Sequence, residues 1–358
     1  MKNKRSKRRP EHHAVHGDAP IMNILLVLAL PEERQYFHSA LVKRKGWEPT
    51  SERRRYLCDY LSPQGRVRVT VQTLDGMGQI ESVLGATSAI VATTPNLVLM
   101  IGISGALHPD VGLGDVVVSN QVKLYSSDKV MSLLVPEGHK IKYVLREPET
   151  SPAVRGEPIV VDRRDKLLND SFLRYERKFI ESNNTDYVLS HAEGVIKQRK
   201  LQPLPSTLPD KIRSLESTNR DRKVFMGWVL GTHHVVDSEE YRRYLTDKDL
   251  NTKLDVHRQN GEPERVLWKK GEILAVDMES YALLRSVEML RATPAEEGGV
   301  ENLRGAIVVR GISDLCAGKG LLDDDTGNAI RQLAIENATD VCLTLIENLD
   351  YPRLLGFH

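Results

Sequence analysis

The sequence predicts an α/β fold with a mixed, mostly parallel central sheet flanked by helices and a long charged insertion. Two observations predict it. Apolar runs of strand length alternate along the chain with segments whose apolar residues recur at helical spacing, and this alternation indicates βαβ units. The chain also has 358 residues, of which 40% are hydrophobic, and that is enough for a sizeable core.

The first predicted elements lie in the N-terminal third. Residues 24–29 form a continuous apolar run, which is typical of a strand buried on both faces. Valines alternate with polar residues over 67–71, which predicts a strand with one polar face, nearer the edge of the sheet. Residues 75–78, Asp-Gly-Met-Gly, predict a turn, and the apolar residues of 80–91 have helical spacing.

The next segments predict the centre of the sheet and then an interruption. Residues 97–101 predict another buried strand, which enters the glycine-containing loop 102–106, and residues 116–118 predict a short strand. Beyond them basic and acidic residues are mixed, and prolines cluster at 203–209. We therefore expect an insertion at about 123–223, carried by the core.

The C-terminal part resumes the strand and helix pattern. The apolar runs 224–230, 273–276 and 306–309 predict the remaining strands. A helix is expected from the end of the second run to about residue 290. The closing helix is expected over 330–349, where the apolar residues form a stripe. These elements together predict one domain over residues 21–350, with a C-terminal tail at 351–358.

The N-terminal residues 1–20 differ from the rest in charge. They carry a net charge of +4, which leaves −3 for the remainder of a chain whose total is +1. A body of that charge has no overall attraction to nucleic acid or membrane, and we expect neither as a partner. The basic tail either is a solvated, disordered leader or binds polyanions.

Sequence features also bear on the compartment. The longest apolar stretch, residues 21–30, is far shorter than the roughly 18–20 residues of a membrane helix, and no small-residue cleavage site follows it. The three cysteines are widely spaced, which argues against a disulfide framework and a cysteine zinc site. We therefore expect a cytoplasmic protein.

Four polar groups follow predicted strands directly: the pair Glu32/Glu33, Ser104, Glu279 and Asp314. In open α/β sheets ligands bind at the carboxyl edge, so these groups predict one site assembled from distant segments. The alternative is that each acid is a helix cap or a solvent-exposed residue in the first turn of a helix. The histidines lack metal-ligand spacing, and no complete dinucleotide fingerprint, phosphate loop or Gly-x-Ser-x-Gly elbow is present. We expect no metal and no cofactor.

The order of the motifs resembles the nucleoside phosphorylase superfamily, and its methylthioadenosine/S-adenosylhomocysteine nucleosidase branch is the nearest match. The resemblance covers residues 22–122 and 224–350. The motifs that carry it are Leu28–Glu33, Asp75–Gly78, Gly102–Leu107, Gly114–Ser119, Ala275–Ser280 and Val309–Asp314.

The resemblance implies a role for each catalytic residue. Glu33 would activate the attacking water. Glu279 would hold the ribose hydroxyls, with Met278 against the sugar. Asp314 would act as general acid at purine N7, positioned by Ser313.

The resemblance also implies binding residues. The purine-stacking loop maps onto Thr232–Val235, which includes His233, His234 and Val235, and His234 stands where the family has an aromatic residue. Gly78, Ser104 and Arg34 complete the predicted substrate-binding set. A homo-oligomer, a dimer or larger, is expected as well.

The resemblance predicts hydrolysis of the N-ribosidic bond of a purine nucleoside or nucleotide, with adenine as the expected base. The residue types are consistent with this reaction, because it needs carboxylates and an activated water. A phosphate-dependent phosphorylase is the first alternative. Such enzymes typically have an arginine before the Gly-Ser loop, where this chain has Met100-Ile101, although Arg34 could hold phosphate. An inactive ligand-binding scaffold is the second alternative.

Two further features suggest a nucleotide substrate. The insertion has basic clusters, among them Arg163-Arg164, Arg199-Lys200 and Arg222-Lys223, which either reach 5′-phosphates or form a solvated surface. The motifs around Glu279 and Asp314 are also similar to nucleosidase domains of bacterial anti-phage effectors, which suggests nucleotide depletion.

Overall fold

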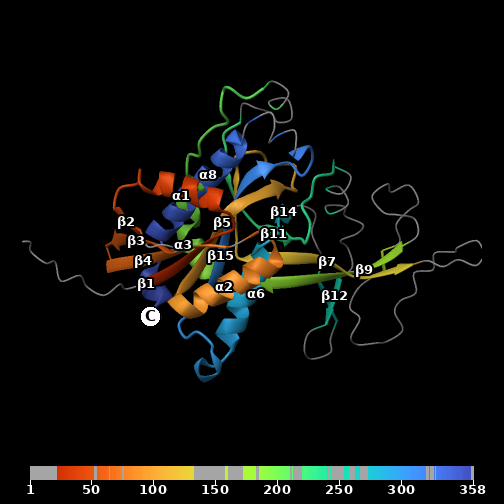
Figure 1. Cartoon of the computed structure of the whole chain (residues 1–358), viewed down its shortest axis with the longest axis horizontal. Helices are drawn as coiled ribbons and strands as arrows, with labels where there is room; N and C mark the ends of the chain where they lie inside the picture. The colour runs from red at the N-terminus through yellow and green to blue at the C-terminus, as the bar shows by residue number, and fades with distance from the viewer. Residues whose placement is uncertain are drawn as a thin grey trace, which may run out of the picture.

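The computed structural model describes residues 22–51, 55–63, 65–74, 76–132, 158–159, 172–182, 185–209, 212, 220–239, 242, 245, 254–257, 263–266, 273–319, 322, 326 and 328–355. In this part of the chain a central sheet lies between two layers of helices (Figure 1). The predicted fold class is confirmed.

Thirteen of the described strands form the main sheet. In chain order they are β1 (Met22–Leu28), β2 (Trp47–Ser51), β3 (Arg55–Ser62), β4 (Gly65–Thr73), β5 (Leu97–Ala106), β6 (Val116–Ser119), β7 (Gln121–Ser132), β8 (Pro158–Ile159), β9 (Phe172–Ser182), β10 (Val224–Met226), β11 (Trp228–Gly231), β14 (Ile273–Asp277) and β15 (Gly305–Asp314). The strands β12 (Leu254–His257) and β13 (Pro263–Val266) form a separate antiparallel pair.

The centre of the main sheet is parallel. Strand β1 pairs in parallel with β4 and β5, and β5 pairs in parallel with β15. Antiparallel pairs join β2 to β3 and β3 to β4 at one edge, and β7 to β9 at the other. Strand β14 joins β5 by a short antiparallel contact at residues 105–106. Because the carboxyl ends of β1, β5 and β15 lie together, the side chains that follow them meet at one edge of the sheet.

Helices cover both faces of the sheet. They are α1 (Pro31–Leu41), α2 (Gln79–Thr93), α3 (Asp186–Lys197), α6 (Ser280–Ala292), α8 (Ala329–Glu347) and the short α9 (Tyr351–Leu354), with a 3₁₀ turn η1 (Ala295–Glu297). Helix α8 packs against α1 and α3 on one face, and α2 packs against α6 on the other (Figure 1). Strand β1 alternates between the two cores, with Leu26 facing α8 and Leu25 facing α2.

Two described helices lie in segments where the sequence predicts an insertion and a tail. Helix α3 falls inside the predicted insertion, yet its apolar stripe, Val188, Leu189, Ala192 and Ile196, is buried in the main core. The predicted C-terminal tail begins with α9, where Tyr351 and Leu354 are buried in the same core. In both places a few buried apolar side chains outweigh the charged residues around them, because burial of that surface stabilises the folded state.

Some predictions fall on residues outside the described part: the tail 1–20, most of the insertion and residues 356–358. Among the residues that the structure does describe, no helix is long and apolar enough to cross a membrane.

Candidate active site

A pocket of about 250 Å³ opens at the carboxyl ends of β1, β5, β14 and β15. It is lined by Ala29, Leu30, Glu33, Met77, Ile103, Ser104, Gly105, Thr232, His234, Val235, Val236, Val276, Asp277, Met278, Glu279, Ser313, Asp314, Lys319 and Arg331. These residues come from both halves of the chain, so the fold assembles the pocket from distant segments, as the strand-end pattern predicts.

Glu33 stands in the first turn of α1, which begins at Pro31 after the end of β1. One carboxylate oxygen, Oε2, accepts hydrogen bonds from the backbone N–H groups of Ala29 at 2.9 Å and Leu30 at 3.0 Å. The other, Oε1, accepts one from Ile103 N–H at 3.2 Å. Burial raises the pKa of Glu33 to about 7, against the nearby Arg310 charge and these backbone bonds, which lower it. Glu33 is therefore poised to exchange a proton near neutral pH.

This pKa predicts a pH dependence of catalysis and of stability. We expect kcat/KM for base release to rise about tenfold per pH unit below a pH of about 7 and then level off. In the folded state Glu33 keeps its proton up to about pH 7, whereas in the unfolded chain it loses the proton near pH 4.5. The stabilising contribution of protonated Glu33 to the free energy of unfolding is therefore fully present below pH 4.5. It is lost, by roughly 3 kcal/mol, as pH rises through about 7. A pH–rate profile tests the first part, and a flat profile from pH 5 to 8 would contradict it.

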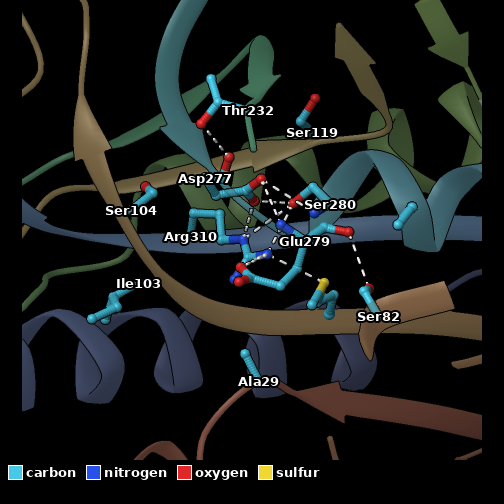
Figure 2. A network of polar contacts seen from close by, with 12 residues as sticks. Ala29, Ser82, Ile103, Ser104, Ser119, Thr232, Asp277, Glu279, Ser280 and Arg310 are labelled. Carbon is cyan, nitrogen blue, oxygen red and sulfur yellow. Dashed lines mark hydrogen bonds and ion pairs between the residues drawn. The ribbon is translucent and has the colours of Figure 1, made fainter. Parts of the chain in front are cut away.

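A buried arginine lies beneath the pocket. The side chain of Arg310, on β15, has its Nε 2.7 Å from Asp277 Oδ2 and its Nη2 3.5 Å from Glu279 Oε2. Its Nη2 also donates to Ser280 Oγ at 3.0 Å. Figure 2 shows these four side chains pointing toward one another. A buried charge needs such partners.

Gly102, on β5, makes room for this arginine. A Cβ at that position would lie 2.1 Å from Arg310 Nη1 and 3.1 Å from Glu33 Oε1. Glycine here has a packing reason, since any side chain would displace the guanidinium that joins the acids.

Glu279 links the site to the Asp-Gly-Met-Gly turn. Its Oε1 accepts a hydrogen bond from Gly78 N–H at 3.0 Å. Asp277 Oδ1 accepts hydrogen bonds from the N–H groups of Glu279 at 3.3 Å and Ser280 at 3.1 Å, at the start of α6. Burial raises the pKa of Glu279, the Arg310 charge opposes this, and the Asp277 charge adds to it. Glu279 is thus fixed in direction at the pocket wall.

Asp314 ends β15 and is buried. Ser313 Oγ donates to Asp314 Oδ2 at 3.0 Å, and the backbone N–H of Cys316 donates to Oδ1 at 3.0 Å. The ammonium of Lys319 lies 3.7 Å from Oδ2. The predicted positioning of Asp314 by Ser313 matches this contact.

Ser104 lines the same pocket and is 5% exposed. Its hydroxyl has no hydrogen-bond partner among the described residues. A buried hydroxyl normally has a partner, so Ser104 Oγ is available to a bound ligand or water.

The structure brings together eight of the predicted site residues in the pocket lining: Glu33, Ser104, His234, Val235, Met278, Glu279, Ser313 and Asp314. Gly78 lies outside this lining, and its backbone N–H donates to Glu279 Oε1. Arg34 and His233 do not line the pocket, and His233 is exposed. His234 and Val235 are exposed as well, so the predicted stacking loop lies at the pocket mouth.

The described basic residues of the insertion do not line the pocket either. Arg163 and Arg164 lie outside the described residues. Arg199 pairs with Asp340 at 2.7 Å, and Arg222 Nη1 donates to a backbone carbonyl at 2.9 Å. These two arginines therefore make contacts within the protein away from the pocket.

Four charged residues of the site are absent from the sequence-based prediction: Asp277, Arg310, Lys319 and Arg331. The first two carried a usable signal, because Asp277 and Arg310 are ionisable residues next to buried strand runs and need partners there. Within the described residues, no group of three or more histidines, cysteines or acids is arranged to hold a metal ion.

Comparison with known proteins finds a family similarity in the N-terminal part of the chain. The family model described as the Phosphorylase superfamily matches residues 23–156. The superfamily match includes Glu33, Gly78 and Ser104, while Glu279 and Asp314 lie beyond it.

Individual relatives agree with the superfamily match. A 5′-methylthioadenosine/S-adenosylhomocysteine nucleosidase of Haemophilus ducreyi is 31% identical over 67 residues, which are 18% of this chain and 29% of that protein. The chain thus matches less than a third of the length of this curated relative.

Solved structures add a likeness of fold. A nucleosidase of the same type from S. pneumoniae, with a transition-state inhibitor, has a TM-score of 0.50 and 15% identity, over 92% of this chain and 100% of that one. The futalosine hydrolase of Helicobacter pylori has a TM-score of 0.49 and 14% identity, over 92% and 99%. The first of these shows that the chain has the fold of such nucleosidases.

Proposed function

We propose that the protein hydrolyses the N-ribosidic bond of a purine nucleoside or nucleotide, with adenine as the expected base. The observation that carries the proposal is the meeting of Glu33, Glu279 and Asp314 in one pocket, from three distant segments. The nucleosidases to which the chain is similar support it.

In the proposed reaction each acid has one task. Glu33 takes a proton from a water as the water oxygen bonds to ribose C1′. The bond between C1′ and the base breaks, and Asp314, as general acid, gives a proton to the departing base. Glu279 accepts hydrogen bonds from the ribose hydroxyls and favours the cationic character that develops on the sugar.

Arg34 was the candidate phosphate ligand for a phosphorylase, and it does not line the pocket. This favours water over phosphate as the nucleophile. Phosphorolysis is kept as the second candidate because two other basic residues, Lys319 and Arg331, do line the pocket.

The proposal is tested by incubating the purified chain with adenosine, methylthioadenosine, AMP and their guanine and hypoxanthine counterparts, each with and without inorganic phosphate. Liquid chromatography measures the free base. Base release without phosphate supports hydrolysis, and release only with phosphate makes the protein a phosphorylase. No release from any of these substrates contradicts both and favours a binding scaffold.

We further propose a homo-oligomer that forms through α2. Four apolar side chains of this helix are exposed, among them Ile80 at 75% and Leu84 at 62%. Burial of such a face is the usual reason for its presence on a folded protein. Leu84→Glu is expected to lower the mass measured by light scattering to that of a monomer, whereas Val195→Glu, on α3, leaves the mass unchanged. An unaltered mass for Leu84→Glu would contradict this interface.

For the cell we propose nucleotide depletion in the cytoplasm as an anti-phage effector, on the motif similarity alone. Phage infection of cells that express the protein should release free adenine and deplete adenine nucleotides. Cells with Glu279→Gln should show neither change. Equal nucleotide pools in the two strains would contradict this role.

A further inference from the structure

A second cavity, of about 420 Å³, lies between the C-terminal end of α1, the segment 199–202 that follows α3, and helix α8. Helices α1 and α8, which form two of its walls, pack side by side (Figure 1). It shares no lining residue with the candidate active site, and its volume is in the range of ligand pockets, roughly 300–1,000 Å³. Most of its charged lining residues are basic: Lys43, Arg44, Lys45, Arg199 and Lys200, against the acids Glu336 and Asp340.

The two arginines of this cavity are paired within the protein. Arg44 Nη2 lies 2.6 Å from Glu347 Oε2 and donates to Thr344 Oγ1 at 2.8 Å, both on α8. Arg199 Nη2 donates to Asp340 Oδ1 at 2.7 Å, and Arg44 pairs with the same acid. These contacts fix both guanidinium groups and neutralise Asp340, so the arginines form the wall of the cavity.

The three lysines differ from the arginines. Lys43, Lys45 and Lys200 are exposed, and within the part of the chain that the structure describes their side chains form no ion pair or hydrogen bond. The remaining acid of the lining, Glu336, accepts hydrogen bonds from two glutamine side chains, at 3.2 and 2.9 Å. Like charges around one cavity repel one another, and a bound anion removes that repulsion.

The backbone that carries Lys200 is held in place against α8. Asn337, on α8, is buried, and its Oδ1 accepts a hydrogen bond from the backbone N–H of Gln202 at 2.9 Å. Its Nδ2 donates to the carbonyl of Gly114 at 2.8 Å. A ligand in the cavity therefore has to order only lysine side chains and no backbone, which lowers the entropic cost of binding.

We propose that this cavity binds a ligand with two or more linked phosphate groups, through Lys43, Lys45 and Lys200. An ammonium group binds phosphate as a point charge, and a terminal phosphate carries roughly two negative charges at neutral pH, against one for a carboxylate. Linked phosphates thus bring the most negative charge into a small volume. Nucleotides and inorganic polyphosphate share this chemistry. The site is separate from the candidate active site, and the assignment does not rest on the proposed hydrolysis.

The test measures the Kd of inorganic tripolyphosphate for the intact chain by isothermal titration calorimetry, at low salt and without divalent metal ions. Lys200→Glu should raise the Kd about tenfold, because it replaces an attraction by a repulsion. Lys43→Gln and Lys45→Gln should each raise it about two- to fivefold, the range of an exposed ion pair. Lys197→Glu is the matched control: this lysine ends α3, pairs with Glu193 and lies outside the cavity lining, so the Kd should stay within about twofold.

The comparison of variants decides the test, because residues 1–20, with their net charge of +4, also attract anions. Three results would overturn the assignment: no binding of tripolyphosphate to the wild type, an equal rise of the Kd in Lys200→Glu and Lys197→Glu, or an unchanged Kd in both Lys43→Gln and Lys45→Gln.

ATP in place of tripolyphosphate distinguishes the two sources of linked phosphates. A Kd for ATP that is similar to that of tripolyphosphate, and that Lys200→Glu raises as well, supports a nucleotide as the ligand. A Kd for ATP that Lys200→Glu leaves unchanged, beside a rise for tripolyphosphate, supports inorganic polyphosphate. Base release is not part of this measurement, so its outcome is independent of the proposed hydrolysis.

Discussion

Asp314→Asn should lower the rate of base release by about 10²–10⁴-fold, the usual range for loss of a general acid. The amide has nearly the shape of the carboxyl group and can still accept the hydrogen bond from Cys316 N–H. It has no acidic proton for the departing base. The measurement is kcat by chromatography of the released base.

The control for this variant is its thermal stability. Its thermal unfolding midpoint should stay within a few degrees of the wild type, which separates loss of the proton donor from loss of structure. Wild-type turnover in Asp314→Asn would remove Asp314 from the mechanism. A substrate whose base leaves without protonation should lose much less, because it does not need the acid.

Arg310→Met should have the largest effect on stability, about 3–5 kcal/mol of the free energy of unfolding, which is typical when one partner of a buried ion pair is removed. The side chain is fully buried, and the variant leaves Asp277 and Glu279 without their cation. Because Arg310 lowers the pKa of Glu33, its loss should also move the rising limb of the pH–rate profile to higher pH. Urea unfolding and the pH profile measure the two effects.

Two further variants make this prediction specific. Arg310→Met combined with Asp277→Asn should be more stable than Arg310→Met alone, since one uncompensated charge is gone. Arg291→Met, on α6, breaks a half-buried pair with Glu288 at 3.0 Å and should cost at most about 1 kcal/mol. A similar cost for Arg310→Met and Arg291→Met would show that the buried network does not stabilise the fold.

The sequence predicts the central strands well and the peripheral elements poorly. Strands such as β1 and β5 are buried on both faces, so their apolar runs identify them directly. The hairpin of β2 and β3 is not predicted, because it mixes charged, aromatic and apolar residues without a clear alternation. Helix α3 has an apolar stripe of only a few residues, and the charged sequence around it hides the pattern.

The residues of the site likewise fall into those that the sequence predicts and those that it does not. Glu33, Glu279 and Asp314 follow strand ends, where ligand groups are expected, and the resemblance assigns each a role. Arg331 could not be found from spacing, and for Arg310 the only signal was an ionisable residue within a buried strand run. Whether an arginine on a strand or helix points into a pocket depends on three-dimensional packing, here on the space above Gly102 and on the approach of α8 to β15.

The positions of the acids and of the stacking loop differ in a way that bears on how substrate preference can change over evolution. The acids stand on or next to buried strands and are tied to backbone groups, so most substitutions there disturb the fold. His234 and Val235 stand at the exposed mouth, where substitution costs little stability. Such a protein can acquire a new base preference by drift at its rim while the bond-breaking residues stay fixed.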